Sequence, residues 1–394
     1  MSSHRFILTG GEIITPDRNL GIGTVLVEDG RILGVEKGLV EAPEGFGTVD
    51  ATGLFVMPGF IDIHTHGAGG YDFMDCTEEA CLGIAREHAR HGTTLLFPTT
   101  LASDNTEMIR FLEVYERVKD QREGAAFGGL HLEGPYFSNE FRGAQNPRYL
   151  KNPDPIDYLP ILEASSDIRR WSIAPELPGA LEFGRILAAR GILPSIAHTS
   201  ALYDDVARAY EAGFTLITHF YSCMNGVTRR NAFRYAGCIE AGYLIDGMTL
   251  EVIGDGIHVP RELLQLILKI KGTDKVVLCT DSMRGAGMPM GTDSILGSLE
   301  KGQRVILEDD VAMMPDRSCF AGSVATTDRL VRTLHRLAGA PLEDAVRMVT
   351  VNPAALMGCG DRKGRLHAGY DADIVLCNKD IYACQTFVGG RKIL

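Results

Sequence analysis

The sequence lacks long apolar runs. No uninterrupted apolar stretch approaches the ~18 residues that a membrane-spanning helix needs, and residues 1–11 do not contain the roughly 7–15-residue apolar segment of a signal peptide. Low-complexity segments, blocks of like charge and internal repeats are absent too. We therefore expect a globular, cytoplasmic protein that has no membrane partner.

Paired cysteine motifs and excess positive charge are also missing. The 9 cysteines are scattered, odd in number and without a C-x-x-C pair, which is not the pattern of a disulfide framework and predicts reduced thiols. Lys and Arg number 39 against 51 Asp and Glu, so the net charge is -12. This balance argues against a nucleic-acid partner and against an anionic membrane surface. An anionic substrate would have to be held by a few local basic residues.

No G-x-G-x-x-G loop follows an early strand, which disfavours the alternative fold, an open doubly wound sheet. Instead, β-rich runs alternate with helical patterns through the middle of the chain. Eight such strands over ~300 residues fit an α/β fold of the (β/α)8 TIM-type barrel. The predicted strands are 54–63, 93–97, 127–132, 171–174, 192–197, 214–218, 248–253 and 275–280. The predicted helices are 77–90, 104–120, 155–166, 178–190, 202–212, 260–270, 322–338 and 341–350.

Both ends of the chain consist of short β-rich runs separated by turns. Asp29-Gly30, between two runs of the N-terminal segment, is a strong hairpin signal. Neither end is long enough to bury a core alone. We therefore predict that residues 1–56 and 360–394 pair into one small β-sandwich domain, and that residues 57–359 form the barrel as a metal-dependent hydrolase domain.

Two histidines mark the end of the first buried run. The apolar stretch from Leu54 to Ile63 leads into His64 and His66, and residues i and i+2 of a strand point to the same side. Two neutral imidazoles on one face suit a divalent metal ion. A buried structural histidine pair explains the H-x-H pattern alone about equally well. The choice between a metal site and a structural pair therefore depends on whether further ligands follow later strands.

Ionisable residues follow other predicted strands in the same way. They are Glu133, His198, His219, His258 and Asp281, which come after the third, fifth, sixth, seventh and eighth strands. A barrel places its site at the C-terminal ends of its strands, so we expect these side chains to meet at one opening. A lone histidine is more often structural, but packing does not explain coincidence at so many strand ends. Several histidines and two carboxylates around one opening are typical of a binuclear hydrolytic site.

Several stretches make the pattern more specific: PGFIDIHTHGAGG, HLEGPY, AHTS, THFYSCM, GDGIHV, CTDS and AGSVATT. With the tail segments GRLHAGYDADIVL and TFVGGRKIL, they resemble the amidohydrolase superfamily, and within it the family of N-acetylglucosamine-6-phosphate deacetylases. The resemblance covers nearly the whole chain and supports a barrel with a split β domain. Superfamily relatives that use a carboxylated lysine on the fourth strand are disfavoured, because 171–174 contains no lysine.

The resemblance implies one or two divalent metal ions, zinc first, with iron or manganese as alternatives. The implied metal-binding residues are His64, His66, Glu133, His198, His219 and Asp281. Glu133 would bridge two ions if both are bound. Asp281 would also be the catalytic residue, first as general base and then as general acid. His131 shares the strand face of Glu133, and we do not expect it to be a ligand.

The resemblance also implies how a substrate is held. His258 would contact the sugar or the reacting amide. Arg230 would bind a phosphate group, and in the family this arginine reaches across a dimer interface, which predicts a homodimer. Three departures from the family pattern concern this part of the site. Gln145 stands in place of a histidine, Ser222 and Cys223 replace an Asn-Ala pair, and a longer arginine stretch makes Arg234 a competitor of Arg230.

The sequence thus predicts metal-dependent hydrolysis of the N-acetyl amide of an amino sugar phosphate, converting N-acetylglucosamine-6-phosphate to glucosamine-6-phosphate and acetate. The alternative is an amidohydrolase that acts on a different N-acyl amino sugar or N-acyl amine, with or without a phosphate. A catalytically inactive barrel that serves as a binding protein is disfavoured, since all six metal-site positions are filled.

Overall fold

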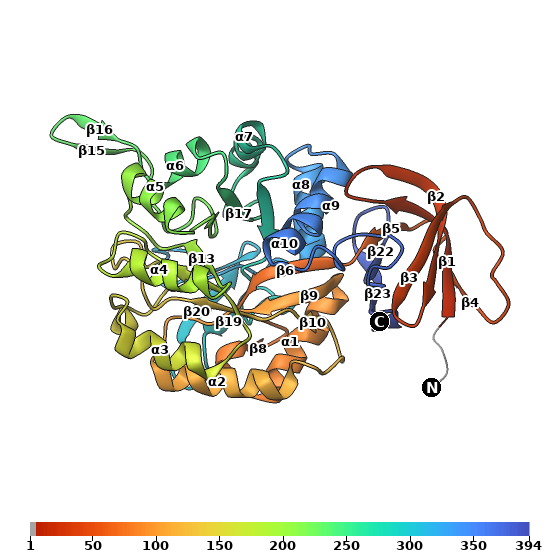
Figure 1. Ribbon diagram of the computed structural model, residues 1–394, viewed down its shortest axis with the longest axis horizontal. Helices are drawn as coiled ribbons and strands as arrows, with labels where there is room; N and C mark the ends of the chain where they lie inside the picture. Colours follow the sequence, from red (N-terminus) through yellow and green to blue (C-terminus); the bar gives the residue numbers. More distant parts are fainter. Residues whose placement is uncertain (1–4, 394) are drawn as a thin grey trace.

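The computed structural model describes residues 5–393. Figure 1 shows two parts: a larger body of helices and strands, and a smaller group of strands in which red N-terminal and blue C-terminal segments lie together. Residues 1–4 and 394, which the predicted terminal domain includes, lie outside the described residues. No helix within 5–393 is long and apolar enough to cross a membrane.

The strands of the smaller part form one 8-stranded sheet, the terminal sheet, in the order β24-β23-β22-β5-β1-β2-β3 with β4 paired to β1. The two chain ends meet where Met57 of β5 lies opposite Val375 of β22. The sequence predicts a β-sandwich of two layers here. Because all eight strands belong to one sheet, both layers of such a sandwich would be formed by that sheet. The strands are β1 (Arg5–Ile14), β2 (Asn19–Glu28), β3 (Arg31–Lys37), β4 (Gly47–Asp50), β5 (Phe55–Pro58), β22 (Ile374–Cys377), β23 (Ala383–Val388) and β24 (Arg391–Lys392).

The predicted strand 54–63 is divided at Gly59, which corrects the sequence-based assignment. Residues before it belong to the terminal sheet as β5, and residues after it begin β6 of the body. A Cβ atom at this position would lie 2.3 Å from the side chain of Thr94, so glycine is required. The Gly59 amide donates to the carbonyl of Asp373 at 2.8 Å, which anchors the passage between the two parts.

The body contains a 3-stranded sheet, β10-β9-β6, and a 6-stranded sheet, β11-β12-β13-β14-β17-β18. All of their ladders are parallel. Two isolated parallel bridges connect the two sheets: Thr99, directly after β9, pairs with His131 of β11, and Thr65 of β6 pairs with Ser282, which follows β18. The strands are β6 (Phe60–Thr65), β9 (Thr93–Pro98), β10 (Ala126–Phe127), β11 (Leu130–Glu133), β12 (Ile168–Ile173), β13 (Leu193–Ile196), β14 (Leu216–Ile217), β17 (Thr249–Ile253) and β18 (Val276–Cys279).

Helices alternate with these strands, as the sequence predicts. Local chemistry fixes their starts: the Thr77 side chain accepts from the Ala80 amide at 3.2 Å before α1, and Asp104 caps α2 in the same way. The helices are α1 (Glu78–Arg90), α2 (Asn105–Val118), α3 (Pro155–Ala164), α4 (Ala180–Ala189), α5 (Tyr203–Glu211), α6 (Cys238–Leu244), α7 (Arg261–Lys271), α8 (Thr327–Arg336), α9 (Leu342–Met348) and α10 (Val351–Leu356). Figure 1 shows α2 and α3 on one side of the body and α8 and α9 beside the terminal sheet.

Several elements are not predicted from the sequence. They are β7 (Gly67–Ala68), β8 (Tyr71–Asp72), η1 (Phe73–Asp75), η2 (Pro147–Tyr149), the hairpin β15 (Thr228–Arg230) and β16 (Phe233–Tyr235), helices α6 and α10, and the sheet β19 (Thr292–Leu296), β20 (Gln303–Glu308) and β21 (Val311–Met313). Helix α8 also begins later than predicted. The segment around Ser323 is instead extended and pairs in parallel with Ser282, which follows β18. The Ser323 amide donates to the Asp281 carbonyl at 2.8 Å.

Candidate active site

The six predicted metal-binding side chains converge where the body strands end. His64 lies on β6, His66 follows it, Glu133 is the last residue of β11, and the others come two residues after β13, β14 and β18. Their exposed fractions run from 0% to 8%, and they are His64, His66, Glu133, His198, His219 and Asp281. His198, His219 and Asp281 have φ of +46°, +30° and +46°, so the backbone turns sharply directly after each strand. Such strain is concentrated at functional sites.

Glu133, His198 and His219 form the first half of the cluster. The Oε1 atom of Glu133 lies 3.5 Å from His198 Nε2 and 3.2 Å from His219 Nε2. The Nδ1 atom of His198 donates to the Phe141 carbonyl at 3.0 Å, which leaves the lone pair of its Nε2 directed into the cluster. The two Nε2 atoms are only 3.2 Å apart. Lone pairs at this distance from each other and from a carboxylate fit a shared cation.

His64, His66 and Asp281 form the second half. The Asp281 Oδ1 atom lies 3.3 Å from His64 Nε2 and 3.1 Å from His66 Nε2. Glu133 also faces this half, with Oε1 3.5 Å from His64 Nε2 and Oε2 3.5 Å from His66 Nε2. The Nε2 atom of His64 is buried and has no hydrogen-bond partner among the described residues. Because Glu133 faces both halves, the geometry suits two neighbouring divalent ions.

The charges within the cluster favour cations. Burial alone would lower the pKa of His66, but the hydrogen bond to Asp281 and the charge of Glu133 outweigh it and raise the pKa to about 9. Burial alone would raise the pKa values of Glu133 and Asp281, yet the neighbouring histidines hold both below their usual range. Both carboxylates are therefore ionised at neutral pH. Divalent ions can replace the protons that these carboxylates would otherwise hold on the neighbouring histidines.

His131 does not join the cluster as a ligand. Its Nδ1 lies 3.2 Å from the Thr99 hydroxyl and its Nε2 lies 2.7 Å from the Ser172 hydroxyl, so both ring nitrogens have partners. Burial and the nearby Arg170 push the pKa of His131 well below its usual range, so this ring is neutral. It packs edge-on against His64 with ring centroids 4.6 Å apart, which supports that ligand from the side.

Two charged residues that the sequence analysis did not single out lie directly beneath the cluster. Glu251 of β17 accepts from His64 Nδ1 at 2.8 Å, and Arg170 of β12 pairs with Glu251. Both side chains are 0% exposed. The sequence signal is a charged residue inside an otherwise apolar strand, TLEVI for Glu251 and IRRWSI for Arg170.

The cluster forms one wall of a cavity of about 320 Å³, within the size range of small-molecule sites. Polar groups from several loops complete its lining, with Phe320 and Leu296 as apolar contacts. The predicted site residues that line it are His66, Glu133, Gln145, His198, His219, Ser222, Cys223, His258 and Asp281. His64 lies behind this wall. The structure thus brings together all the predicted site residues except Arg230.

Gln145 and His258 are held in defined orientations at the cavity wall. The Oε1 atom of Gln145 accepts from the Ala102 amide at 2.9 Å, so its Nε2 group donates to Glu133 Oε2 at 2.7 Å. His258 Nδ1 lies 2.7 Å from Asp255 Oδ2, which leaves its Nε2 for a ligand. Gln145 is thus bonded to a proposed metal ligand, a contact beyond the substrate role that the sequence predicts.

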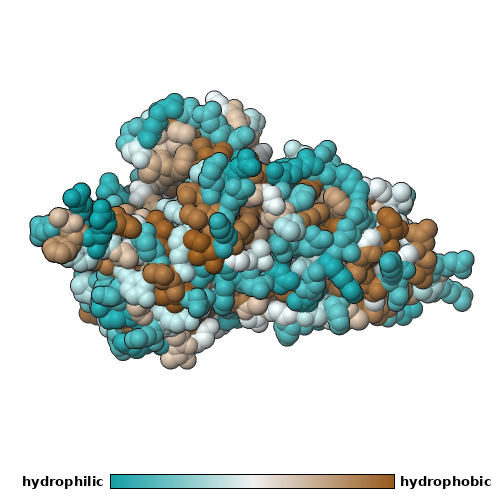
Figure 2. Space-filling view, turned by 90° about the horizontal axis from the view of Figure 1, so that it is seen from above, coloured by the Kyte–Doolittle hydropathy of each residue, from teal (hydrophilic) through white to brown (hydrophobic). Residues whose placement is uncertain are grey.

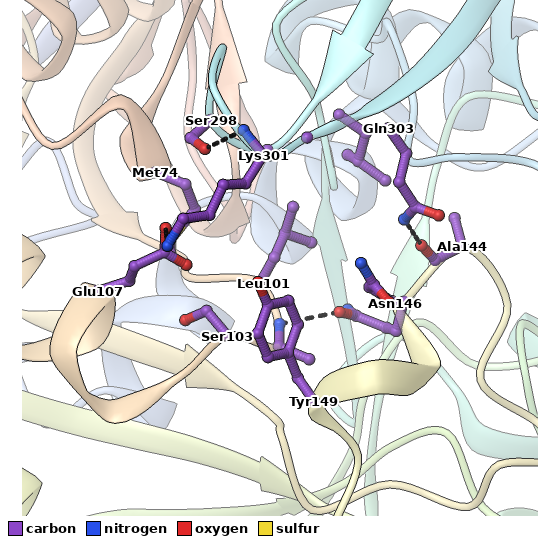
Figure 3. A pocket seen from close by; sticks show the side chains of 15 residues that line it. Met74, Leu101, Ser103, Glu107, Ala144, Asn146, Tyr149, Ser298, Lys301 and Gln303 are labelled. Carbon is purple, nitrogen blue, oxygen red and sulfur yellow. Dashed lines mark hydrogen bonds and ion pairs between the residues drawn. The ribbon is translucent and has the colours of Figure 1, made fainter.

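A smaller cavity adjoins the main one and shares Leu101, Ala144, Gln145 and Leu296 with it. Figure 3 shows Lys301 reaching toward Glu107 and Gln303 toward the Ala144 carbonyl, at 2.8 Å and 2.6 Å respectively. These two contacts attach the β19–β20 turn to α2 and the start of β20 to the segment that precedes Gln145. The three-stranded sheet β19–β21 is therefore fixed as part of the site wall.

Arg230 lies away from the cavity, on the β15–β16 hairpin. Figure 1 shows this hairpin projecting from the body beyond α5 and α6, and the same end of the molecule in Figure 2 carries hydrophilic and hydrophobic surface. The turn residues Asn231 and Ala232 have φ of +48° and +69°, as a tight two-residue hairpin requires. Arg230 is exposed, with its guanidinium 5.9 Å from the Tyr235 ring centroid. Arg234 is exposed on the opposite strand of the hairpin.

Comparison with known proteins places the chain among hydrolases. It is 30% identical to N-acetylglucosamine-6-phosphate deacetylase of Lysinibacillus sphaericus over 93% of this chain and 92% of that protein. It is 27% identical to N-acetylgalactosamine-6-phosphate deacetylase of Escherichia coli O157:H7, over 98% of both. The solved structure of N-acetyl-D-glucosamine-6-phosphate deacetylase from Mycobacterium smegmatis, in complex with N-acetyl-D-glucosamine-6-phosphate, superimposes with a TM-score of 0.90 at 28% identity, covering 99% of each chain.

The profile of the Amidohydrolase family matches residues 55–392, which include every residue of the metal cluster. The structural relatives imply a TIM-type barrel with an additional domain, in agreement with the predicted fold class. The His and Glu side chains of the cluster provide the metal-binding groups on which amidohydrolases depend. The chain therefore belongs to the amidohydrolase family, and the predicted class of enzyme is confirmed.

Proposed function

We propose that this enzyme hydrolyses the N-acetyl amide of N-acetylglucosamine-6-phosphate and releases glucosamine-6-phosphate and acetate. The observation that carries the proposal is the six-residue cluster of imidazoles and carboxylates at the wall of a cavity of about 320 Å³. Relatives that match most of the chain at about 30% identity are named for this reaction, which supports the choice of substrate.

We further propose that the cluster holds one or two divalent ions, zinc first, with iron or manganese as alternatives. Glu133, His198 and His219 would hold one ion; His64, His66 and Asp281 would hold the other. Glu133 would bridge them, since its two oxygens face both halves. When bound, such ions lower the pKa of a water molecule and polarise the amide carbonyl.

Asp281 moves the proton in this proposal. Its carboxyl is ionised at neutral pH, because His64 and His66 hold its pKa below the usual range against the effect of burial. It can therefore accept a proton from the attacking water as the carbon–oxygen bond forms. It then donates that proton to the amide nitrogen as the carbon–nitrogen bond breaks, since an amide nitrogen leaves poorly without a proton.

His258 and Gln145 orient the reactants in this scheme. His258 is fixed by Asp255 and offers its Nε2 to the sugar or to the amide in the cavity. Gln145 is neutral and already donates to Glu133, so it orients that carboxylate and cannot supply a positive charge. Ser222 and Cys223 line the same cavity and would contact the sugar phosphate.

Phosphate binding is assigned to Arg230, with Arg234 as the competing candidate. Arg230 is exposed on a projecting hairpin and does not line the cavity of its own chain, so we propose that it reaches the cavity of a second subunit in a homodimer. Exposed apolar side chains on and beside the hairpin favour such a contact, since Phe233 is 70% and Val227 is 59% exposed. Local cations are needed because the chain carries a net charge of -12.

We also propose that the body is a closed barrel and that the terminal segments form a separate domain. The body would be a closed barrel formed by residues 57–359, with the isolated bridges Thr99–His131 and Thr65–Ser282 at its two seams. Residues 1–56 and 360–394 would be a separate domain with its own core of Val25, Ile32 and Phe387. We place the enzyme in the cytoplasm, consistent with its 9 unpaired cysteines.

A second candidate substrate is N-acetylgalactosamine-6-phosphate or another N-acyl amino sugar. Gln145, Ser222 and Cys223 depart from the family pattern and all line the cavity, so they bear on sugar recognition and leave the metal ligands unchanged. The relative from Escherichia coli named for the galactosamine compound matches 98% of this chain at 27% identity.

The test is kcat/KM for acetate release from N-acetylglucosamine-6-phosphate, N-acetylgalactosamine-6-phosphate and unphosphorylated N-acetylglucosamine, with the zinc-loaded enzyme. We expect the first substrate to be hydrolysed fastest and the unphosphorylated sugar slowest. A preference for the galactosamine compound would select the second candidate. Equal values for phosphorylated and unphosphorylated sugars would contradict the phosphate part of the proposal.

A further inference from the structure

An ion pair buried in the body lies beneath the metal cluster. Arg170 comes from β12 and Glu251 from β17, and β13 and β14 separate these strands in the sheet. Both side chains are 0% exposed. Removing two charges from water costs more than a buried pair usually returns, so stability alone does not explain such a pair.

Glu251 contacts a ligand from each half of the metal cluster through one oxygen. Its Oε1 atom accepts from His64 Nδ1 at 2.8 Å and from the backbone amide of His219 at 3.1 Å. With Nδ1 protonated, the Nε2 atom of His64 presents a lone pair to the cluster. The bond to the His219 amide holds the backbone of a ligand whose φ is +30°.

Arg170 holds the residues that immediately precede these two ligands. It pairs with Glu251 Oε2, and its Nη1 also donates to the carbonyl of Ile63 at 3.3 Å. Its Nη2 donates to the Thr218 hydroxyl at 2.8 Å. Its Nε donates to the Ser195 hydroxyl at 3.0 Å, on the strand that leads to His198. The guanidinium thus links β6, β13 and the residue directly after β14.

We propose that Glu251 and Arg170 are a positioning pair that fixes both halves of the metal cluster together, so that loss of the pair weakens both metal positions. Glu251 sets the tautomer of His64 and the backbone position of His219, while Arg170 keeps Glu251 charged and in place. Arg170 and His64 hold the pKa of Glu251 well below its usual range despite burial, in agreement with this arrangement. The inference rests on the metal site of the proposed function.

The test compares metal affinity in Glu251→Gln with that in the wild-type enzyme, using zinc and a chelator of known affinity as competitor. The matched control is Asp373→Asn, which breaks the buried Lys363–Asp373 pair beside the terminal sheet, directly before β22. We expect Glu251→Gln to weaken zinc binding about 10–100-fold, the usual cost of losing a group that orients a metal ligand. Asp373→Asn should leave zinc affinity unchanged. Equal affinity in Glu251→Gln and wild type would overturn the inference.

A second experiment separates joint positioning from support of His64 alone. The variant His64→Ala/His66→Ala should retain one ion, held by Glu133, His198 and His219. Adding Glu251→Gln to it should weaken that remaining ion further, because a neutral amide oxygen accepts more weakly from the His219 amide and the side chain no longer forms an ion pair with Arg170. An unchanged affinity of the remaining ion would limit Glu251 to His64 and overturn the joint role.

Two further measurements keep the inference testable if Glu251→Gln does not fold. Thr218→Val removes one hydrogen bond of Arg170 with little change in shape, and should weaken zinc binding about 2–10-fold, as expected for one hydrogen bond. Histidine ring nitrogen shifts of the zinc-loaded wild-type enzyme should show His64 protonated at Nδ1. Normal zinc affinity in Thr218→Val, or His64 protonated at Nε2, would contradict the positioning role. A wild-type enzyme that binds no ion would overturn the metal site itself, whereas ions bound with normal affinity in Glu251→Gln and Thr218→Val would overturn only this inference.

Discussion

The metal cluster and the β15–β16 hairpin are built in opposite ways. In the cluster, every proposed ligand is at most 8% exposed and lies within 3.5 Å of another proposed ligand. On the hairpin, Arg229, Arg230 and Arg234 are exposed, and none of the three forms an ion pair with a carboxylate within the described part of the chain. One subunit thus contains all the side chains proposed to bind metal and to move the proton, whereas the groups proposed to bind phosphate lie outside its own cavity.

Replacing the proposed base should have the largest effect, because it belongs to the metal cluster, whose proposed members all lie in one subunit. We expect Asp281→Asn to lower kcat about 10²–10⁴-fold, the usual span for a lost general acid–base, while fold and metal content stay near wild type. Asp309→Asn, at an exposed turn, is the control. Steady-state acetate release and elemental analysis provide the measurement. A variant that keeps more than about a tenth of wild-type kcat would remove Asp281 from this role.

Removing the two histidines of the H-x-H pair should show whether this pair binds its own ion. We expect His64→Ala/His66→Ala to lose one of two ions and keep the other, since Glu133, His198 and His219 remain 3.2–3.5 Å apart in the other half. Elemental analysis of the purified double variant is the measurement, with His335→Ala on α8 as the control. Unchanged metal content would mean that the pair is structural.

Substitutions in the β15–β16 hairpin should weaken substrate binding and leave the metal content unchanged. We expect Arg230→Ala to lower kcat/KM for N-acetylglucosamine-6-phosphate about 10–150-fold, as for one lost charge-assisted hydrogen bond. The value for unphosphorylated N-acetylglucosamine should change little. Arg234→Ala is the matched comparison on the opposite strand. If Arg234→Ala shows the loss and Arg230→Ala does not, the phosphate ligand is Arg234.

A charged group outside both regions should affect stability only, and by the smallest amount. Burial lowers the pKa of His91, but Asp328 and Glu87 outweigh it and raise the pKa to about 9 from its ordinary value of 6.5. Because the folded pKa is the higher one, this stabilisation is complete below about pH 6.5 and is lost as pH rises through 9. His91→Gln should therefore cost about 1–2 kcal/mol at pH 6 and almost nothing at pH 10.

Melting temperatures of wild type and His91→Gln across this pH range are the measurement. His335→Gln serves as the control, since the ring of His335 contacts the carbonyl of Ala340 at 2.9 Å. A difference in melting temperature that grows toward pH 10 would contradict the expected direction of the effect.

The sequence could predict that the proposed ligands lie together because each follows a short apolar run. His64, His198, His219 and Asp281 are polar residues at or just beyond such runs, and the barrel rule brings strand ends together. The predicted α/β class and barrel type agree with the structural relatives. The division of the first strand at Gly59 could not be predicted, since it depends on the packing of Thr94 against that position.

Residues whose partners lie far away in the sequence could not be predicted. Glu251 and Arg170 are separated by about eighty positions, and only their common burial shows that they form a pair. The sheet β19–β21 was missed because its strands pair with one another beyond the barrel, outside the strand–helix alternation. The direction in which the β15–β16 hairpin projects also depends on tertiary contacts, so sequence alone could not show that Arg230 lies away from the cavity.

The most direct test of the central claim is acetate release from N-acetylglucosamine-6-phosphate by enzyme that has been stripped of metal by a chelator and then titrated with zinc. We expect negligible activity without metal and recovery that reaches a plateau at one or two zinc ions per chain, with Asp281→Asn binding the same number but recovering little activity. Full activity in the metal-free enzyme, or metal-restored enzyme that releases no acetate from this substrate, would contradict the claim.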